Sequence, residues 1–155
     1  MSTADWLLMF HVTSAFLFVG GSVTAGILNL FAIRAERPSE AATLLRLIRT
    51  TLPPIFVGVA GTLVFGIWLW HEEHFSIGAA WIWISLALWV VASALGGIGG
   101  RHQQRSRELA ERLAREGDAP SDELRALLRD PTGTAISYAA GLATLGILAL
   151  MIWKP

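Results

Sequence analysis

A long apolar stretch, Trp6–Ile33, constrains this sequence more than any other feature, because it contains no Asp, Glu, Lys or Arg. It is longer than the roughly 20 apolar residues that a helix needs to cross a bilayer. One ionisable side chain, His11, lies inside it. An ionisable group at membrane depth is costly without a partner, so it marks a candidate functional site. The central question is therefore what His11 faces.

The composition supports a membrane protein, since 54% of the residues are hydrophobic and only 15% are charged. The formal net charge is zero, so no nucleic-acid partner is expected. The absence of cysteine excludes disulfides, thiolate metal sites, iron–sulfur clusters and covalently attached haem. No basic segment precedes the first apolar run and no clear cleavage site follows it, which predicts a retained helix rather than a signal peptide.

Hydrophobic segments predict an all-α fold, a four-helix transmembrane bundle that forms a single domain over residues 1–155. The predicted helices cover residues about 5–33, 50–71, 79–100 (extending to about 116) and 132–153. The connections 34–49 and 101–131 contain amphipathic helical extensions, and neighbouring helices are expected to run antiparallel.

The basic residues predict the orientation. Four arginines lie in 34–49 and seven in 101–131, whereas the connection between the second and third helices has none. By the positive-inside rule, both arginine-rich connections are cytoplasmic and both termini face outward, as a multi-pass protein of a bacterial inner membrane. An outer belt of tryptophans agrees with this orientation: Trp6, Trp68, Trp70, Trp81, Trp83 and Trp153.

Local signals predict several helix boundaries. Ser39 is a plausible N-cap with Glu40 in the first turn of a short amphipathic helix, and Ser121 is a second N-cap. Pro53 and Pro54 are expected to break or kink the chain before the second membrane helix.

Small and polar residues predict the helix faces that pack together. On the first helix they follow spacings of three or four: His11, Ser14, Phe18, Ser22, Ala25 and Asn29. Similar ridges are expected on the later helices, at Gly58–Thr62–Gly66, Ser93–Gly97, Gly96–Gly100 and Gly133–Ser137–Gly141. Such ridges also suit a homodimer or a larger membrane complex.

Three histidines near the outer ends are the candidate ligands. His11 lies roughly 7–8 Å past Trp6, and either hydrogen-bonds to a neighbouring helix or ligates a metal or haem. His71 and His74 flank two glutamates, so a divalent-metal site is conceivable, although a solvated rim is the plainer reading. His71 points away from the Gly58–Gly66 ridge if that helix is regular. His102 is interpreted as an interfacial residue.

The chain resembles an uncharacterised family of short bacterial, mostly actinobacterial, integral membrane proteins with a domain of unknown function. The stretches that carry this resemblance are DWLLMFHVTSAFLFVGG, ALGGIGGR and EGDAPSDELRALLRDP. The first helix is also similar to copper-resistance-D-like and HemJ-like protoporphyrinogen oxidase proteins, through His11, Phe18 and Gly21. In the HemJ-like group the histidine is associated with haem. That group has tryptophan where Phe18 stands, and its basic residue within the membrane helices is missing here.

The leading functional hypothesis is a b-type haem protein of the membrane, serving electron transfer or a redox reaction near the outer face. The expected cofactor-binding residues are His11, His71, Ser14, Phe18 and Asn29. The first alternative is handling of copper or another divalent metal by His11, His71 and His74. The second is an accessory subunit without a cofactor, in which His11 only hydrogen-bonds. Membrane lipids are expected partners in each case, and whether the protein is an enzyme is left open.

Overall fold

The structure, a computed structural model, describes residues 2–73 and 80–153 and contains helices without strands in this part of the chain. The helices are α1 (Thr3–Arg34), α2 (Pro38–Glu72), α3 (Ala80–Arg115), α4 (Asp122–Leu128) and α5 (Pro131–Trp153). Four helical segments of the described chain are long and apolar enough to cross a membrane, namely α1, α2, α3 and Asp122–Trp153. The prediction of an all-α protein with four membrane-spanning helices is confirmed.

The helix ends show why the elements begin where they do. A reciprocal cap starts α1, because the Ser2 hydroxyl accepts from the Asp5 amide and the Asp5 carboxylate accepts from the Ser2 amide. Ser121 caps α4 as predicted, since its hydroxyl accepts from the Leu124 amide. At the start of α5, the Asp130 carboxylate accepts from the Gly133 amide at 3.0 Å.

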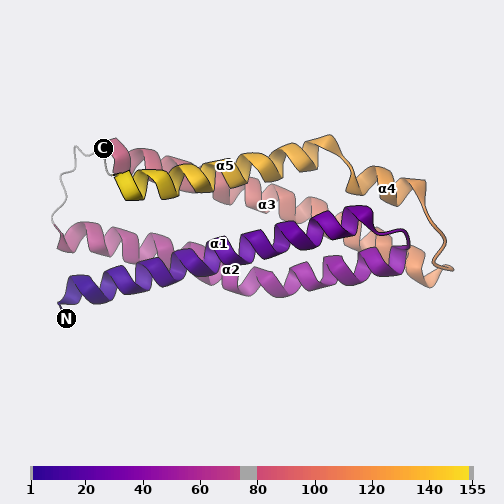
Figure 1. Cartoon of the computed structure of the whole chain (residues 1–155), viewed down its shortest axis with the longest axis horizontal. Helices are drawn as coiled ribbons and strands as arrows, with labels where there is room; N and C mark the ends of the chain where they lie inside the picture. Colours follow the sequence, from indigo (N-terminus) through magenta and orange to yellow (C-terminus); the bar gives the residue numbers. More distant parts are fainter. Residues whose placement is uncertain (1, 74–79, 154–155) are drawn as a thin grey trace.

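The prediction for the start of the second helix is wrong. Its N-cap is Arg37, and Pro38 occupies the first turn, where a missing N–H costs nothing. Ser39 therefore lies within α2 and does not cap it. Its hydroxyl instead donates to the Asp118 carboxylate. Pro53 and Pro54 also lie inside one continuous helix assignment, although the ribbon of α2 bends near its middle (Figure 1). Most of the predicted connection 34–49 is thus the first part of α2.

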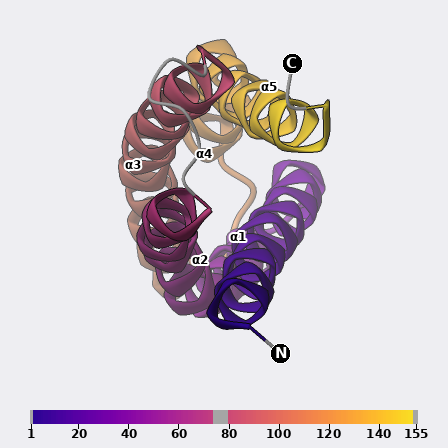
Figure 2. The same ribbon diagram turned by 90° about the vertical axis from the view of Figure 1, so that its left-hand side faces the viewer.

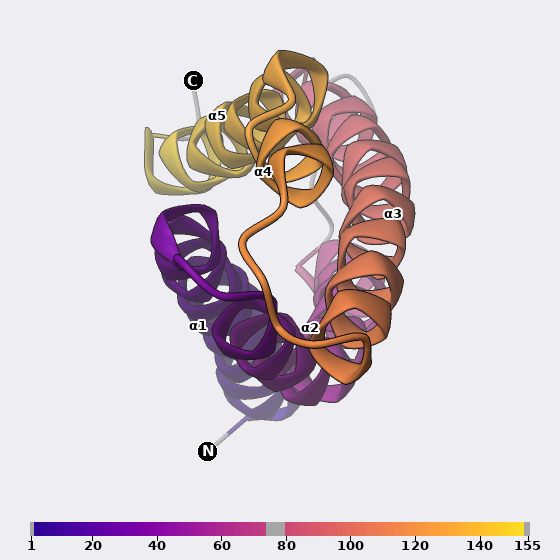
Figure 3. The ribbon, with the colours of Figure 1, turned by 90° about the vertical axis from the view of Figure 1, so that its right-hand side faces the viewer.

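The long helices pack in the order α1, α2, α3, α5 (Figures 2 and 3). The start of α1, the end of α2, the start of α3 and the end of α5 meet at one end of the molecule (Figure 1). At this end Trp70 and Trp83 make an edge-to-face contact between α2 and α3, with ring centroids 6.0 Å apart. At the opposite end lie the first turns of α2, the last turns of α3, and α4. We refer to the second end as the arginine-rich end.

The buried hydrophobic core lies at the arginine-rich end. At about 1.5 Å per residue, α3 is about 54 Å long and exceeds the roughly 30 Å of a bilayer core, so its charged part extends beyond the membrane segment. The buried cluster comes from four helices: Ala32, Ala41, Ala42, Leu45, Ile48, Ala110 and Leu124. The membrane segments, in contrast, leave large apolar side chains exposed, such as Phe16 at 75% and Leu142 at 69%, as expected where lipid is the solvent.

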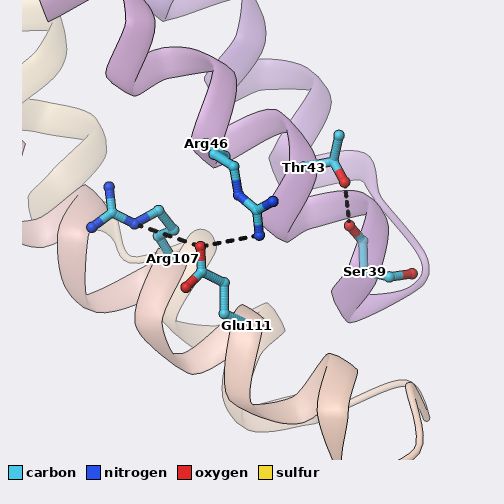
Figure 4. A network of polar contacts seen from close by, with 5 residues as sticks. All are labelled: Ser39, Thr43, Arg46, Arg107 and Glu111. Carbon is cyan, nitrogen blue, oxygen red and sulfur yellow. Dashed lines mark hydrogen bonds and ion pairs between the residues drawn. The ribbon is translucent and has the colours of Figure 1, made fainter.

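Two sets of polar contacts hold the arginine-rich end together. Glu111 of α3 pairs with Arg107 of the same helix at 3.9 Å and with Arg46 of α2 at 3.5 Å (Figure 4). The Ser39 amide and hydroxyl both donate to the Asp118 carboxylate at 2.7 Å. Asp118 has a positive φ of 56°, next to Gly117 at 130°, so this turn is shaped to bring the carboxylate to the start of α2.

Candidate functional site

His11 contacts α2 through one specific hydrogen bond. Its Nδ1 lies 3.0 Å from the backbone carbonyl oxygen of Thr62. A carbonyl can only accept, so Nδ1 carries the proton, and the neutral ring then presents Nε2 as an acceptor. The ring lies directly on Gly66, where an added Cβ would be 3.0 Å from Cε1 and 3.1 Å from Nδ1. The missing side chain at Gly66 is therefore what admits the imidazole.

Below His11, α1 and α2 approach each other backbone to backbone. A Cβ at Gly58 would lie 2.7 Å from the Ser14 carbonyl oxygen and 2.9 Å from the Phe18 Cα. A Cβ at Gly61 would collide with the Ser14 hydroxyl. Ser14 is buried, and its hydroxyl donates to the Phe10 carbonyl at 2.7 Å. The predicted faces of the two helices thus meet, and Gly61, which the sequence reading did not single out, belongs to the contact.

An aromatic stack flanks His11 on the side of the α1 N-terminus. Phe10 stacks on Phe65 of α2, with ring centroids 5.3 Å apart, and on Trp6 of its own helix at 6.1 Å. Such offset pairs add about 0.5–1.5 kcal/mol beyond burial. Phe10 precedes His11 and Phe65 precedes Gly66, so the stack lies beside the His11–Gly66 contact in the sequence of both helices, and His11 itself is half-buried.

His71 is not brought into the α1–α2 contact. It is exposed at the end of α2, five residues beyond Gly66, which at 100° per residue places it on a different side of the helix. His74 lies outside the described residues. Within the described part of the chain, no group of three or more His, Asp or Glu side chains is placed to hold a metal ion.

Asn29 lies about 27 Å along α1 from His11, so the two residues do not share a site. Asn29 instead lines a pocket between α1, α3 and the start of α5. The pocket is a small open hollow of about 20 Å³, with room for roughly one water-sized group. It is lined by Asn29, Gly99, His102, Gln103, Ser106, Leu128, Asp130, Gly133, Thr134 and Ser137. We refer to this as the His102 pocket.

The sequence predicted His102 as an interfacial residue but gave no sign of the contacts that it makes. Its Nε2 donates to the Leu127 carbonyl oxygen at 3.1 Å, and its ring lies on Gly133, where a Cβ would be 3.0 Å from Nε2. Asp130 was identifiable in advance as the residue before Pro131, a typical cap position. The pairing of His102 with Gly133 has no such local signal, because thirty residues of chain separate them.

The predicted small-residue ridges of α3 do not mediate close helix packing within the described residues. An added Cβ at Gly96, Gly97 or Gly100 meets nothing within 4 Å, and the same holds for Gly141 of α5. The prediction that these glycines pack closely is wrong for the single chain, whereas Gly133 does meet a neighbour.

The chain belongs to a family described as predicted integral membrane proteins (DUF2269), which it matches over residues 5–155. No curated protein and no solved structure matches the chain. The predicted membership of an uncharacterised membrane-protein family is confirmed at this level. The actinobacterial origin and the likeness of the first helix to copper-resistance-D-like and HemJ-like proteins stay predictions.

Proposed function

We propose that this member of the DUF2269 family binds a b-type haem through His11. The observation that carries the proposal is the bond from Nδ1 to the Thr62 carbonyl. Histidines that ligate metals typically donate their other ring N–H to a carbonyl or carboxylate, which fixes the tautomer and aims the free nitrogen. His11 has this arrangement, with Nε2 as the free nitrogen.

The surroundings of His11 suit an apolar macrocycle better than a bare metal ion. A copper or zinc site needs several ligands, and the described residues place no such group around His11. A haem needs one imidazole and apolar walls, which Phe10 and Phe65 supply. Since α1 and α2 touch at Gly58, the group would bind outside their contact, against the half-buried edge of the ring.

We propose His11 as the residue that would hold the haem, because His71 lies on another side of α2. The group would supply one-electron redox chemistry when bound. His11 would hold the metal through Nε2, while Thr62 keeps the ring in one tautomer and Gly66 leaves room for it. The aromatic stack would help to exclude water from the N-terminal side.

The proposed location is a bacterial inner membrane, with the arginine-rich end in the cytoplasm. The arginines of the chain gather at one end of the bundle, and the positive-inside rule supports a cytoplasmic position for such an end. His11 then lies near the outer face of the membrane, and an electron partner would act from that side.

Absorption spectra of the purified full-length protein, oxidised and dithionite-reduced, test the proposal. We expect a Soret band in the wild type and in the matched variants His71→Ala and His102→Ala, and its loss in His11→Gln. Glutamine can still donate to the Thr62 carbonyl, so the variant removes the imidazole while retaining a bond to α2. Size-exclusion chromatography checks that it remains folded.

A colourless wild type, purified after haem is supplied during expression, would overturn the haem proposal. So would a Soret band that His11→Gln leaves unchanged. A colourless protein that tolerates His11→Gln would instead favour a structural role for His11, as in an accessory subunit.

A further inference from the structure

We propose that the His102 pocket binds a primary ammonium group. Two sources carry this chemistry, namely the head group of an aminophospholipid and free ammonium. The proposal is independent of haem binding, because the pocket shares no residue with the surroundings of His11.

The hydroxyl groups that line the pocket have already donated their hydrogens within the protein. Three hydroxyls of the pocket donate to backbone carbonyls one turn earlier in their own helices. Ser106 donates to His102 at 3.2 Å, Thr134 to Asp130 at 3.2 Å and Ser137 to Gly133 at 3.0 Å. Each hydroxyl has a single hydrogen, so these oxygens can offer a ligand only their lone pairs.

The two ionisable groups of the pocket are also left with acceptor capacity. The Nε2 proton of His102 is donated to Leu127, so the neutral ring keeps the Nδ1 lone pair. Asp130 accepts from the Gly133 amide through Oδ2. Among the described residues, no ion pair involves Asp130, so its carboxyl group remains available to a ligand.

Two amide side chains complete the lining. Asn29 and Gln103 come from α1 and α3, and each can turn either its oxygen or its NH₂ group toward a ligand. The pocket as a whole therefore offers one carboxylate, several lone pairs and two adaptable amides. A ligand that brings several N–H donors and a positive charge satisfies this set, whereas an anion does not.

A primary ammonium fits the set better than a metal cation. Hard monovalent and divalent cations prefer oxygen ligands, but the Nδ1 atom of His102 is a nitrogen acceptor that an N–H donor uses directly. The lining residues of α5 lie in its first two turns, beside the charged part of α3, and we therefore place the pocket at the level of the lipid head groups. An aminophospholipid can place its ammonium there and leave its phosphate near the exposed Arg101 and Arg129.

The first arm of the test uses lipid. Full-length wild type and the variant Asn29→Leu are purified from nanodiscs that contain equal amounts of phosphatidylethanolamine and phosphatidylcholine, and retained lipid is quantified by native mass spectrometry. The two lipids differ only in the methyl groups that remove the N–H donors. We expect about tenfold preference for phosphatidylethanolamine in the wild type, since hydrogen bonds to charged groups contribute roughly 1.5–3 kcal/mol. The preference falls to near unity in the variant.

The second arm uses free ions. The thermal unfolding midpoint in a detergent without amines is compared in ammonium, sodium and tetramethylammonium chloride at one ionic strength. A higher midpoint in ammonium alone, absent in Asn29→Leu and in Asp130→Asn, supports the site with free ammonium as a ligand. Preference in the lipid arm alone assigns the head group as the ligand. Equal responses to all three salts together with no lipid preference would overturn the proposal.

The variant Ser93→Leu, which lies on α3 outside the pocket lining, is the matched control for a polar residue replaced by leucine in a membrane segment. It must keep the wild-type preference. If Ser93→Leu loses the preference as completely as Asn29→Leu does, the assignment to the His102 pocket is wrong.

Discussion

The two histidines that the bundle half-buries, His11 and His102, are held in the same way and surrounded differently. Each lies on a glycine of a neighbouring helix, Gly66 or Gly133, and each donates a ring N–H to a backbone carbonyl. The donating nitrogen is Nδ1 in His11 and Nε2 in His102. The free nitrogen is consequently Nε2 in the first case and Nδ1 in the second.

A hydrogen bond from a ring N–H to a backbone carbonyl therefore does not by itself assign a role to a half-buried histidine. The same bond fixes a tautomer in both places, and the neighbours decide what the remaining lone pair can bind. Aromatic rings and glycine around His11 suit a metal carried in an apolar group. A carboxylate, hydroxyls and amides around His102 suit a ligand that donates several hydrogen bonds.

The largest loss of stability is expected at Gly58, where α1 and α2 pack closely near His11. Gly58→Ala places a Cβ against backbone atoms of α1, which cannot move aside as a flexible side chain can. We expect it to lower the unfolding free energy by about 2–3 kcal/mol, at the upper end of overpacking costs. The measurement is unfolding in mixed sodium dodecyl sulfate micelles, followed by tryptophan fluorescence.

The matched control is Gly20→Ala on α1, where a Cβ meets nothing within 4 Å. This variant should be neutral or slightly stabilising, because alanine is the better helix former. Equal losses in both variants would show that the α1–α2 contact is not what stabilises the His11 region.

A smaller effect is expected when either histidine loses its glycine. Gly66→Ala and Gly133→Ala each bring a Cβ to about 3.0 Å from an imidazole, which must shift by a few tenths of an ångström. We expect each to cost about 1 kcal/mol in the same assay. Gly66→Ala should weaken the Soret band without changing lipid preference, and Gly133→Ala should do the reverse.

If both variants change both the Soret band and the lipid preference, the two histidine sites are coupled and their description as separate sites is wrong. Gly97→Ala, on an α3 position with open space around the added Cβ, serves as the control and should change neither readout.

The smallest effect concerns the turn that leads into α4, which presents the Leu127 carbonyl to His102. The Ser39 hydroxyl and amide donate to Asp118 and hold the pKa of its carboxyl below its ordinary value of 3.8. A lowered native pKa means that this contact stabilises the fold above the ordinary pKa and is lost as the pH falls through the native one. We expect the Ser39 amide to lose protection against hydrogen exchange in acid, measured relative to the intrinsic exchange rate at the same pH, with little change at His11.

Asp118→Asn should give the same loss of protection already at neutral pH, since asparagine tolerates the positive φ but carries no charge. Exchange that is unchanged in Asp118→Asn would mean that the charge of Asp118 does not hold the turn.

The amino-acid sequence by itself determined the membrane class, the four spans and the faces on which α1 and α2 meet. These follow from local properties, namely the length of uncharged runs, helical spacing and the loss of side chains at glycine. Ser121 was predictable as a cap for the same reason, because a cap and its helix are adjacent in the chain. The start of α2 was missed although its signal, Pro38 after Arg37, is also local.

Only the tertiary structure decided which partner each polar group takes. Ser39 has the form of an N-cap, yet a carboxylate from the far connection accepts both of its donors. Asn29 shares a helical stripe with His11, yet the bundle assigns the two residues to different sites. Gly96 and Gly100 of α3 follow the same four-residue ridge pattern as Gly58, Thr62 and Gly66 of α2, yet a Cβ added at either α3 glycine meets nothing within 4 Å. The physical reason is that spacing reports which residues share a face, whereas the neighbour across that face is set by how helices distant in sequence pack.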